Sequence, residues 1–291
     1  MAKVTGFLLL FRERIKMKNI KKGIKDYYYS KVVDIVDHES TRHYHHAFEL
    51  YYMKDGACNY FIGDHSYRVL PGDVVIVPEE TIHRTNYGGI LHSRMLINCS
   101  PDYIPEVLRE RILELGHLYR NTYIIGAMES IFEKIEKEYN QADELSEEAI
   151  RCHTAELFFL LLRNENEHES RRSESTLIAP VLKYIQQNYA NDVKLSVAAK
   201  LVSVSAEHLS RVFKKETGFG FKEYLTILRL QKAEEMLRNE PGRAVCEVAY
   251  ACGFNDGNYF SYKFKEAYGV PPTMVKGKKS GQRIQSVDIG E

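Results

Sequence analysis

The chain has 291 residues, of which 44% are hydrophobic and 27% are charged, and its formal net charge is zero. This composition indicates a soluble globular protein of two domains. The apolar stretch GFLLLF at residues 6–11 is too short for a signal-peptide core or a membrane span, so we expect a cytoplasmic protein with no membrane partner. Five cysteines, an odd number without a CxxC pair, argue against a disulfide framework and a zinc knuckle.

Charge and histidine divide unevenly along the chain. Residues 176–291 hold 17 Lys and Arg against 12 Asp and Glu, whereas the preceding residues hold 23 against 28. A basic C-terminal part has the sign expected for a partner made of phosphates. Ten of the eleven histidines precede residue 175, which indicates that the two parts perform different chemistry.

The N-terminal part has the pattern of a β-barrel. Between residues 32 and 98, short β-prone runs such as NYFI, YRVL and VVIV are separated by Gly-Asp and Pro-Gly. We assign residues 1–122 to this domain and expect about the first 20 residues to be disordered. Met17 is an alternative start, so the sequence leaves open whether residues 1–16 belong to the native protein.

Two amphipathic helices are predicted after the barrel. In residues 123–139 and 147–163, apolar residues recur at intervals of three and four. The run LFFLLL at residues 157–162 offers more apolar surface than packing against its own barrel needs. We therefore expect residues 123–163 to be a helical dimerisation segment, with cover by the rest of the same chain as the alternative.

A repeat lies in the C-terminal part. Residues 164–175 are polar and predict a linker, residues 176–279 show only helical patterns, and residues 280–291 predict a flexible tail. Within the helical part, LSRVFKKETG at Leu209–Gly218 is echoed by FSYKFKEAYG at Phe260–Gly269. Such an echo indicates one supersecondary unit used twice.

Each copy extends into a helix-turn-helix pattern. A small residue stands four positions before the turn in both copies, Ala199 before Ser203 and Ala249 before Gly253. Two helices that cross steeply need this small residue and a turn position that tolerates φ > 0. The turn is ten residues from the shared Phe in the first copy and eleven in the second, so the second helix is predicted to begin differently.

Together with the joining helix YLTILRLQKAEEMLRNEP and the ending GFNDGNYFSYKFKEAYGVPPTMV, the paired units resemble the DNA-binding domain of the AraC/XylS family of transcription regulators. The resemblance covers residues 177–276. It implies that the chain binds double-stranded promoter DNA, acts with RNA polymerase and forms a homodimer. Family members often have Arg where this chain has Tyr262, so the family's base preference is not carried over.

The second helix of each unit supplies the predicted DNA contacts. A recognition helix reads base edges with its N-terminal and outward side chains, while phosphate contacts fix its register. Arg211 is predicted to contact a guanine and Asn258 an adenine or a phosphate. The outward sets are Ser205, Glu207, His208, Arg211 and Lys215 in the first unit, and Asp256, Asn258, Tyr259, Tyr262 and Lys263 in the second.

A second constellation lies in the N-terminal part. The stretch HYHHAFELYYMKDG at residues 43–56, followed by PGDVVIVPEETIH ending in His83, resembles the two metal motifs of the cupin barrels. The resemblance implies that His43, His45, Glu49 and His83 converge, a set that suits a divalent Zn, Ni, Mn or Fe ion. Regulators of the family often keep such a barrel without metal, so we favour an effector pocket that requires no cofactor. Its predicted residues are His43, His45, Glu49, Tyr51, Tyr60 and His83, which suit a sugar or another small polar effector.

The sequence thus predicts an α+β protein, with an N-terminal cupin-like β-barrel, a helical dimerisation hairpin and an all-α double helix-turn-helix domain. The predicted function is a ligand-responsive, sequence-specific transcription regulator, an activator of carbohydrate or small-molecule metabolism genes, and not an enzyme. Two alternatives stay open. One is a metal-dependent cupin enzyme, an isomerase or dioxygenase, with a DNA-binding appendage. The other is a metal-sensing regulator that uses the same four ligands.

Overall fold

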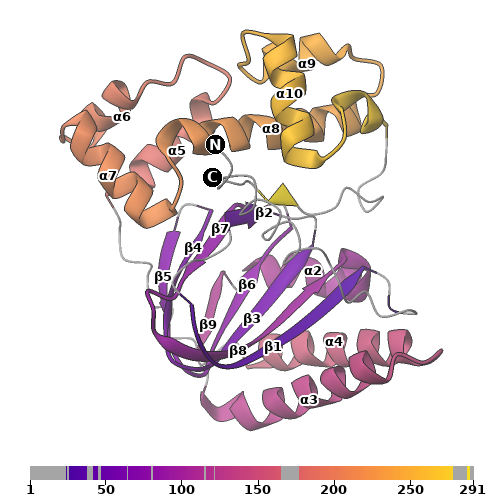
Figure 1. The fold of residues 1–291 in the computed structure, drawn as a ribbon. Coiled ribbons are helices and arrows are strands. Elements are labelled where there is room, and N and C mark those ends of the chain that lie inside the picture. Colours follow the sequence, from indigo (N-terminus) through magenta and orange to yellow (C-terminus); the bar gives the residue numbers. More distant parts are fainter. Residues whose placement is uncertain are drawn as a thin grey trace, which may run out of the picture.

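The chain folds into a β-rich N-terminal part and a helical C-terminal part. The computed structural model describes residues 24, 26–37, 42–44, 47–63, 65–79, 81–114, 116–120, 122–164, 177–277 and 287–288. Figure 1 shows the helical part above one end of the β-strands and a pair of helices on the opposite side of the β-domain. The predicted α+β class, with the β-rich part first, is confirmed.

Within the described residues, the β-domain consists of two antiparallel sheets of five strands each. The first sheet contains, in spatial order, β1 (Tyr27–Val36), β8 (Leu91–Cys99), β3 (Phe48–Asp55), β6 (Asp73–Val77) and β9 (Leu118–Arg120). The second contains β10 (Val287–Asp288), β2 (Arg42–Tyr44), β7 (His83–Asn86), β4 (Cys58–Ile62) and β5 (His65–Val69). Strand β10 lies in the segment predicted as a tail.

Alternation along the strands gives each sheet two different faces, because successive side chains point to opposite sides. On the first sheet, Tyr52 and Ile97 belong to the apolar cluster that includes the neighbouring helices, whereas Tyr51 and Val75 belong to a cluster between the two sheets. The second sheet contributes Tyr60 to that inner cluster. The space between the sheets is therefore the interior of a barrel.

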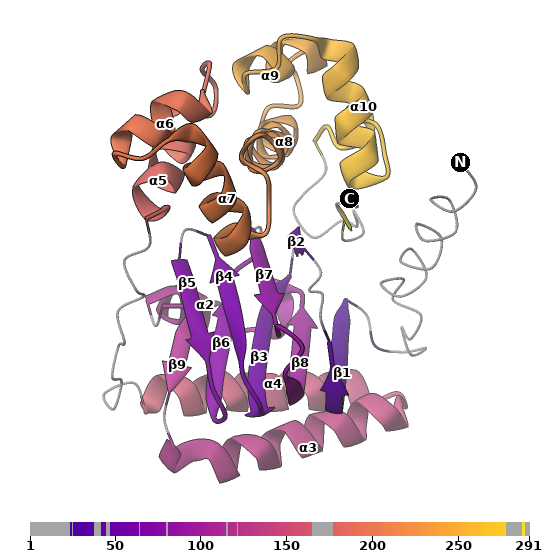
Figure 2. The ribbon, with the colours of Figure 1, turned by 60° about the vertical axis from the view of Figure 1, so that its left-hand side comes forward.

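A helical hairpin covers the outer face of the first sheet. It consists of α3 (Ile125–Gln141) and α4 (Ser146–Arg163), which run beneath the sheet in Figure 2. Phe132 of α3 and Leu157 of α4 are fully buried against the sheet. The hairpin agrees with the two predicted helices. Sequence reasoning did not predict the short elements before it, which are η1 (Pro101–Tyr103), α2 (Glu106–Glu114) and η2 (Thr122–Ile124).

The C-terminal part is a helical domain arranged around one long helix. Its elements are α5 (Ala179–Asn188), α6 (Leu195–Leu201), α7 (Ala206–Thr217), α8 (Phe221–Asn239), α9 (Val245–Ala251), α10 (Gly257–Tyr268) and η4 (Pro272–Met274). Helix α8 joins the pair α6–α7 to the pair α9–α10 (Figure 1). Phe213 of α7, Leu237 of α8 and Phe260 of α10 are fully buried in one shared core.

The helical domain contacts the outer face of the second sheet. Phe61 of β4 belongs to the apolar core of the helical domain. The hydroxyl of Tyr224 on α8 donates to the carbonyl oxygen of Gly63 at 3.1 Å. The Arg84 side chain of β7 lies so close to Gly218 that a Cβ there would overlap it. Figure 2 shows the end of α7 directly above β4 and β7.

The strands that make this contact also line the barrel interior. Phe61 faces the helical domain, whereas its neighbour Tyr60 lies in the inner cluster. In the same way Arg84 contacts the helical domain, and its neighbour His83 is buried next to Glu49. Two adjacent pairs of residues therefore span the sheet from the barrel interior to the helical domain.

Candidate DNA-binding and effector-binding sites

Helices α6 and α7 form the first helix-turn-helix unit. Ser203 in the turn has φ of 56°, a left-handed conformation that is uncommon for a residue other than glycine. The predicted tolerance of positive φ at this position is confirmed. Ser205 caps α7, since its side-chain oxygen accepts a hydrogen bond from the backbone N–H of His208 at 3.1 Å. The helix ends at Gly218, where φ is 80°.

Helices α9 and α10 form the second unit, which has the same sequence of turn, cap and terminal glycine. Gly253 takes φ of 85° at the turn. A Cβ at this position would lie 2.8 Å from the carbonyl oxygen of Ala190, so only glycine fits. Helix α10 begins four residues after Gly253, whereas α7 begins three residues after Ser203. The predicted difference in how the second helix begins is confirmed.

The start of α10 is capped more strongly than the start of α7. One carboxylate oxygen of Asp256 accepts hydrogen bonds from the backbone N–H groups of Asn258 at 2.7 Å and Tyr259 at 3.1 Å. A carboxylate also interacts favourably with the positive end of the helix dipole. Ser205 and Asp256 were predicted as DNA contacts, and the structure gives both side chains a capping role that sequence reasoning did not assign.

The other predicted DNA contacts lie on the two recognition helices. Lys263 is partly buried, forms an ion pair with Glu266 at 2.7 Å and lies 5.6 Å from the ring centre of Tyr262. Tyr259 is 49% exposed and Tyr262 is 63% exposed, so about half of the first residue and most of the second face solvent. The exposed members of the set are Glu207, His208, Arg211, Lys215, Asn258, Tyr259 and Tyr262.

A buried polar cluster lies between the two sheets. Glu49 on β3 is 3% exposed, and its Oε1 accepts a hydrogen bond from the hydroxyl of Tyr60 on β4. Its Oε2 lies 3.7 Å from Nε2 of His83 on β7, and it accepts from the Asn98 amide at 3.0 Å in the amide orientation that satisfies both groups. Burial and the neighbouring Glu49 raise the pKa of Tyr60, so this hydroxyl stays protonated and able to donate.

The cluster continues through two further tyrosines to a guanidinium. The ring of Tyr51 lies 5.3 Å from that of Tyr60, and its hydroxyl donates to the Tyr87 hydroxyl at 3.4 Å. Tyr87 interacts in turn with Arg94. Burial alone would lower the pKa of Arg94, but Tyr87, Tyr51 and Glu49 outweigh it and raise that pKa, so the guanidinium is charged.

Comparison with known families finds a match in each of the two parts of the chain. Residues 33–153 match the AraC-like ligand binding domain, and residues 198–278 match a helix-turn-helix domain. The chain is 25% identical over 249 residues to the HTH-type transcriptional activator RhaS of Escherichia coli, a match that covers 82% of this chain and 88% of RhaS. The chain belongs to the AraC family.

Solved structures of similar proteins cover different shares of this AraC family chain. Apo ToxT from Vibrio cholerae is 12% identical, covers 87% of this chain and 98% of its own, and has a TM-score of 0.37. The C-terminal domain of AraT, a response regulator from Geobacillus stearothermophilus, is 34% identical, covers 35% of this chain and 84% of its own, and has a TM-score of 0.33.

The structure brings together part of the effector pocket predicted for the AraC-like ligand-binding domain. Glu49, Tyr51, Tyr60 and His83 lie in one cluster. The side chains of His43 and His45 lie outside the described residues. Sequence reasoning missed Tyr87, Arg94 and Asn98. Arg94 and Asn98 could have been found from the stretch RMLIN of β8. The two polar residues stand four positions apart, and side chains at an even spacing on a strand point to the same face of the sheet.

The metal site predicted for this AraC-like domain remains a prediction. Backbone register places His43 opposite His83. Within the part of the chain that the structure describes, no three His, Cys, Asp or Glu side chains gather as a metal site would require. Glu49 contacts Tyr60 and Asn98 as well as His83, one of the other predicted ligands. None of the described helices is long and apolar enough to cross a membrane.

Proposed function

We propose that this AraC family regulator activates carbohydrate or small-molecule metabolism genes when a small polar effector, such as a sugar, binds inside its barrel. The buried cluster of Glu49, Tyr60 and Asn98 supports the pocket, because a carboxylate, a hydroxyl and an amide are the groups that bind hydroxylated ligands. RhaS, the relative described above, is a transcriptional activator. In this proposal the barrel binds the effector without turning it over, and the DNA-bound protein contacts RNA polymerase.

The observation that carries the proposal is that the two helix-turn-helix units have the same backbone features. Both have a left-handed turn residue, a side-chain cap and a glycine end, and both are joined to α8. Two such units let one chain enter successive major-groove segments about 34 Å apart. Arg211, on the exposed side of α7, has the bidentate geometry suited to guanine.

The test measures DNA binding by the full chain. An operator is first selected from a random duplex library, and binding is then measured as a function of salt for the unaltered chain and for Arg211→Ala. We expect affinity to fall steeply with salt, because phosphate contacts release counterions. Arg211→Ala should lose about 1–3 kcal/mol at one base position. Arg68→Ala, an exposed arginine of the barrel, serves as the matched control. Affinity that is flat with salt contradicts the proposal.

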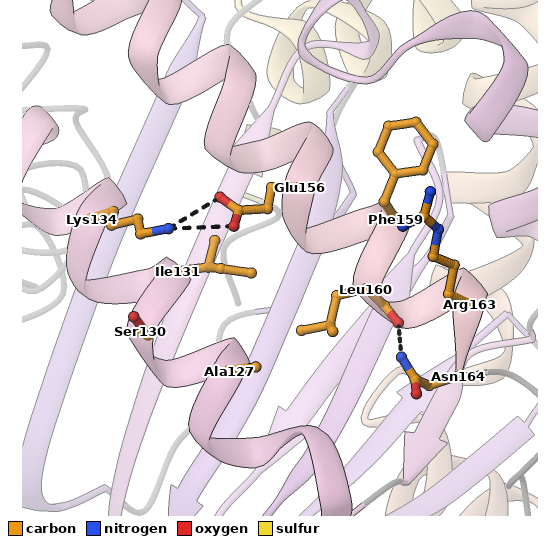
Figure 3. Close-up of a pocket in the computed structure, with 9 residues that line it drawn as sticks. All are labelled: Ala127, Ser130, Ile131, Lys134, Glu156, Phe159, Leu160, Arg163 and Asn164. Atoms are coloured by element: carbon orange, nitrogen blue, oxygen red, sulfur yellow. Dashed lines mark hydrogen bonds and ion pairs between the residues drawn. The ribbon is translucent and has the colours of Figure 1, made fainter.

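We also propose that the helical hairpin forms a homodimer. Of the apolar run at residues 157–162, Leu157, Phe158 and Leu161 are buried against the first sheet, but Phe159 is 40% exposed. Phe159 borders a groove between α3 and α4 that has a volume of about 360 Å³. Figure 3 shows Ile131 and Leu160 inside this groove and the Lys134–Glu156 ion pair across it. A second copy of the hairpin would cover this mixed apolar and charged surface.

Sedimentation velocity of the full chain tests the dimer. We expect a dimer for the unaltered protein at tens of micromolar, and a monomer for Phe159→Asp, because a carboxylate would be buried in the interface. Val107→Asp introduces the same charge at a residue of α2 that is 71% exposed, and it should leave the dimer intact. A folded chain that sediments as a monomer without substitution shows that the proposed interface is wrong.

A further inference from the structure

Arg94 projects from β8 into the interior of the barrel. Its register partner on β3 is Met53, which belongs to the inner cluster. Directly opposed residues of antiparallel strands point to the same face of a sheet. Leu96 and Asn98, the next residues of the same parity on β8, are opposed to Tyr51 and Glu49. Arg94 and Glu49 therefore lie on the same inner face of the first sheet.

Among the residues that the structure describes, no carboxylate contacts Arg94 to balance its charge. Within the described part of the chain Arg94 forms no ion pair, and its Nη1 atom is buried without a hydrogen-bond partner. Glu49 attracts Arg94 only through space, because its oxygens are occupied by Tyr60 and Asn98. Tyr87 forms a hydrogen bond with the guanidinium but carries no charge, and Nη1 has no partner, so this buried cation points to a ligand that completes it.

We infer that Arg94 is the anion-binding end of the barrel interior, so that the effector is a small hydroxylated molecule carrying one carboxylate or phosphate group. This inference rests on the proposed effector-binding function and narrows its ligand class from polar molecules to hydroxylated anions. A neutral sugar would leave the guanidinium unbalanced, whereas a sugar acid or a sugar phosphate would neutralise it.

The two ends of the interior suit the two parts of such a molecule. The planar guanidinium of arginine binds carboxylate and phosphate oxygens in pairs. At the other end, Glu49 accepts hydrogen bonds, and Asn98 and Tyr60 each have a polar group next to it. Arg94 and Asn98 are four residues apart on one strand, about 13 Å along its axis. Tyr51 lies between them and contacts both ends, through the ring of Tyr60 and the hydroxyl of Tyr87.

Thermal unfolding of the full chain with small anions tests the inference. The probes are acetate and inorganic phosphate, compared with chloride at equal ionic strength. We expect one or both at roughly 20 mM to raise the Tm of the unaltered chain by about 2–5 °C. Arg94→Met should lose this shift and should not be less stable than the unaltered chain without anion, because the substitution removes an unbalanced charge. A larger shift with acetate indicates a carboxylate ligand, and a larger shift with phosphate indicates a phosphate ester.

Matched variants separate this site from general salt effects. Arg68→Met makes the same substitution at an exposed residue of β5 and should keep the full anion shift. If Arg94→Met does not fold, Arg94→Gln is used in its place, and Arg94→Lys should retain part of the shift. Equal shifts in the unaltered chain and the Arg94 variants, or no anion shift in any of them, overturn the inference. So does an Arg94→Met chain that is several degrees less stable without anion.

Promoter binding distinguishes a failure of the proposed anion site from a failure of the proposed regulator function. If Arg94→Met loses the anion shift and the unaltered chain binds its selected operator, both the anion site and the regulator function are supported. If the chain binds its operator but Arg94 has no part in any anion shift, only the inference about the ligand class is wrong. If the unaltered chain binds no operator, the proposed function itself is wrong.

Discussion

The two helix-turn-helix units have the same backbone arrangement, but they differ in the residue at the turn and in the parts of the protein that surround them. Both turns have positive φ, yet the first has Ser203 and the second has Gly253. The glycine is required because the backbone of Ala190 approaches it closely, whereas the side chain of Ser203 is exposed to solvent. The comparison shows that the local packing, and not the turn conformation alone, decides which residue a turn accepts.

The units also differ in their surroundings. The end of the first unit lies against the barrel, through Gly218 and the start of α8. The recognition helix of the second unit presents the aromatic pair Tyr259 and Tyr262 to solvent, where the first presents charged residues such as Arg211. One supersecondary unit therefore serves two environments with the same backbone.

The largest expected effect comes from exchanging the turn residues. Gly253→Ser should destabilise the helical domain by about 2–4 kcal/mol, because it combines positive φ with a backbone clash. Ser203→Gly should change stability by no more than about 0.5 kcal/mol, because relief of strain and the flexibility of the unfolded chain oppose each other. Urea unfolding followed by far-ultraviolet circular dichroism measures both. Equal effects would show that the close approach to Ala190 does not decide the residue.

A smaller difference is expected at the caps. Asp256→Ala should cost about 1–2 kcal/mol, since it removes two hydrogen bonds and a favourable charge at the helix start. Ser205→Ala removes one hydrogen bond and should cost about 0.5–1 kcal/mol. Asp256→Asn keeps the acceptor and should lie between the Ala variant and the unaltered chain. The same unfolding measurement applies, and a costlier loss at Ser205 would reverse the ranking of the two caps.

The third expected effect, smaller than the loss of the Asp256 cap, concerns the contact with the barrel. Tyr224→Phe removes the hydrogen bond to Gly63 and should cost about 0.5–1.5 kcal/mol. Tyr250→Phe makes the same change at a residue of the second unit that is 59% exposed, and it should be nearly neutral. Hydrogen exchange at the β4–β5 turn should rise in the first variant only. Identical exchange in both variants would mean that this contact does not stabilise the turn.

Much of this architecture could be predicted from the sequence because it depends on local signals. The repeated decapeptide, the small residues at the crossings and the positive-φ turn at Ser203 all act within a few residues of one another. The capping roles of Ser205 and Asp256 were also local, since both side chains stand just before a helix. They were assigned to DNA because an outward residue at a helix start fits either role.

The proposed effector pocket was predictable only in part because it depends on contacts distant in sequence. Glu49 and Asn98 meet through the pairing of β3 with β8, and Tyr87 meets Tyr51 across the barrel. No motif spans these separations. The contact between Tyr224 and Gly63 joins residues of different domains, 161 positions apart, and nothing in either local sequence indicates it.

Strand β4 carries a consequence for insertions and deletions. Tyr60 faces the barrel interior and Phe61 faces the helical domain. Which residue lies on which face of the sheet therefore depends on the register of β4, because side chains alternate between the two faces. One added residue before Tyr60 would place its phenol in the domain contact, whereas one lost residue would place the phenyl ring of Phe61 next to Glu49. The proposed ligand site and the domain contact would fail together in one genetic event, whereas a point substitution at either residue changes one of them at a time.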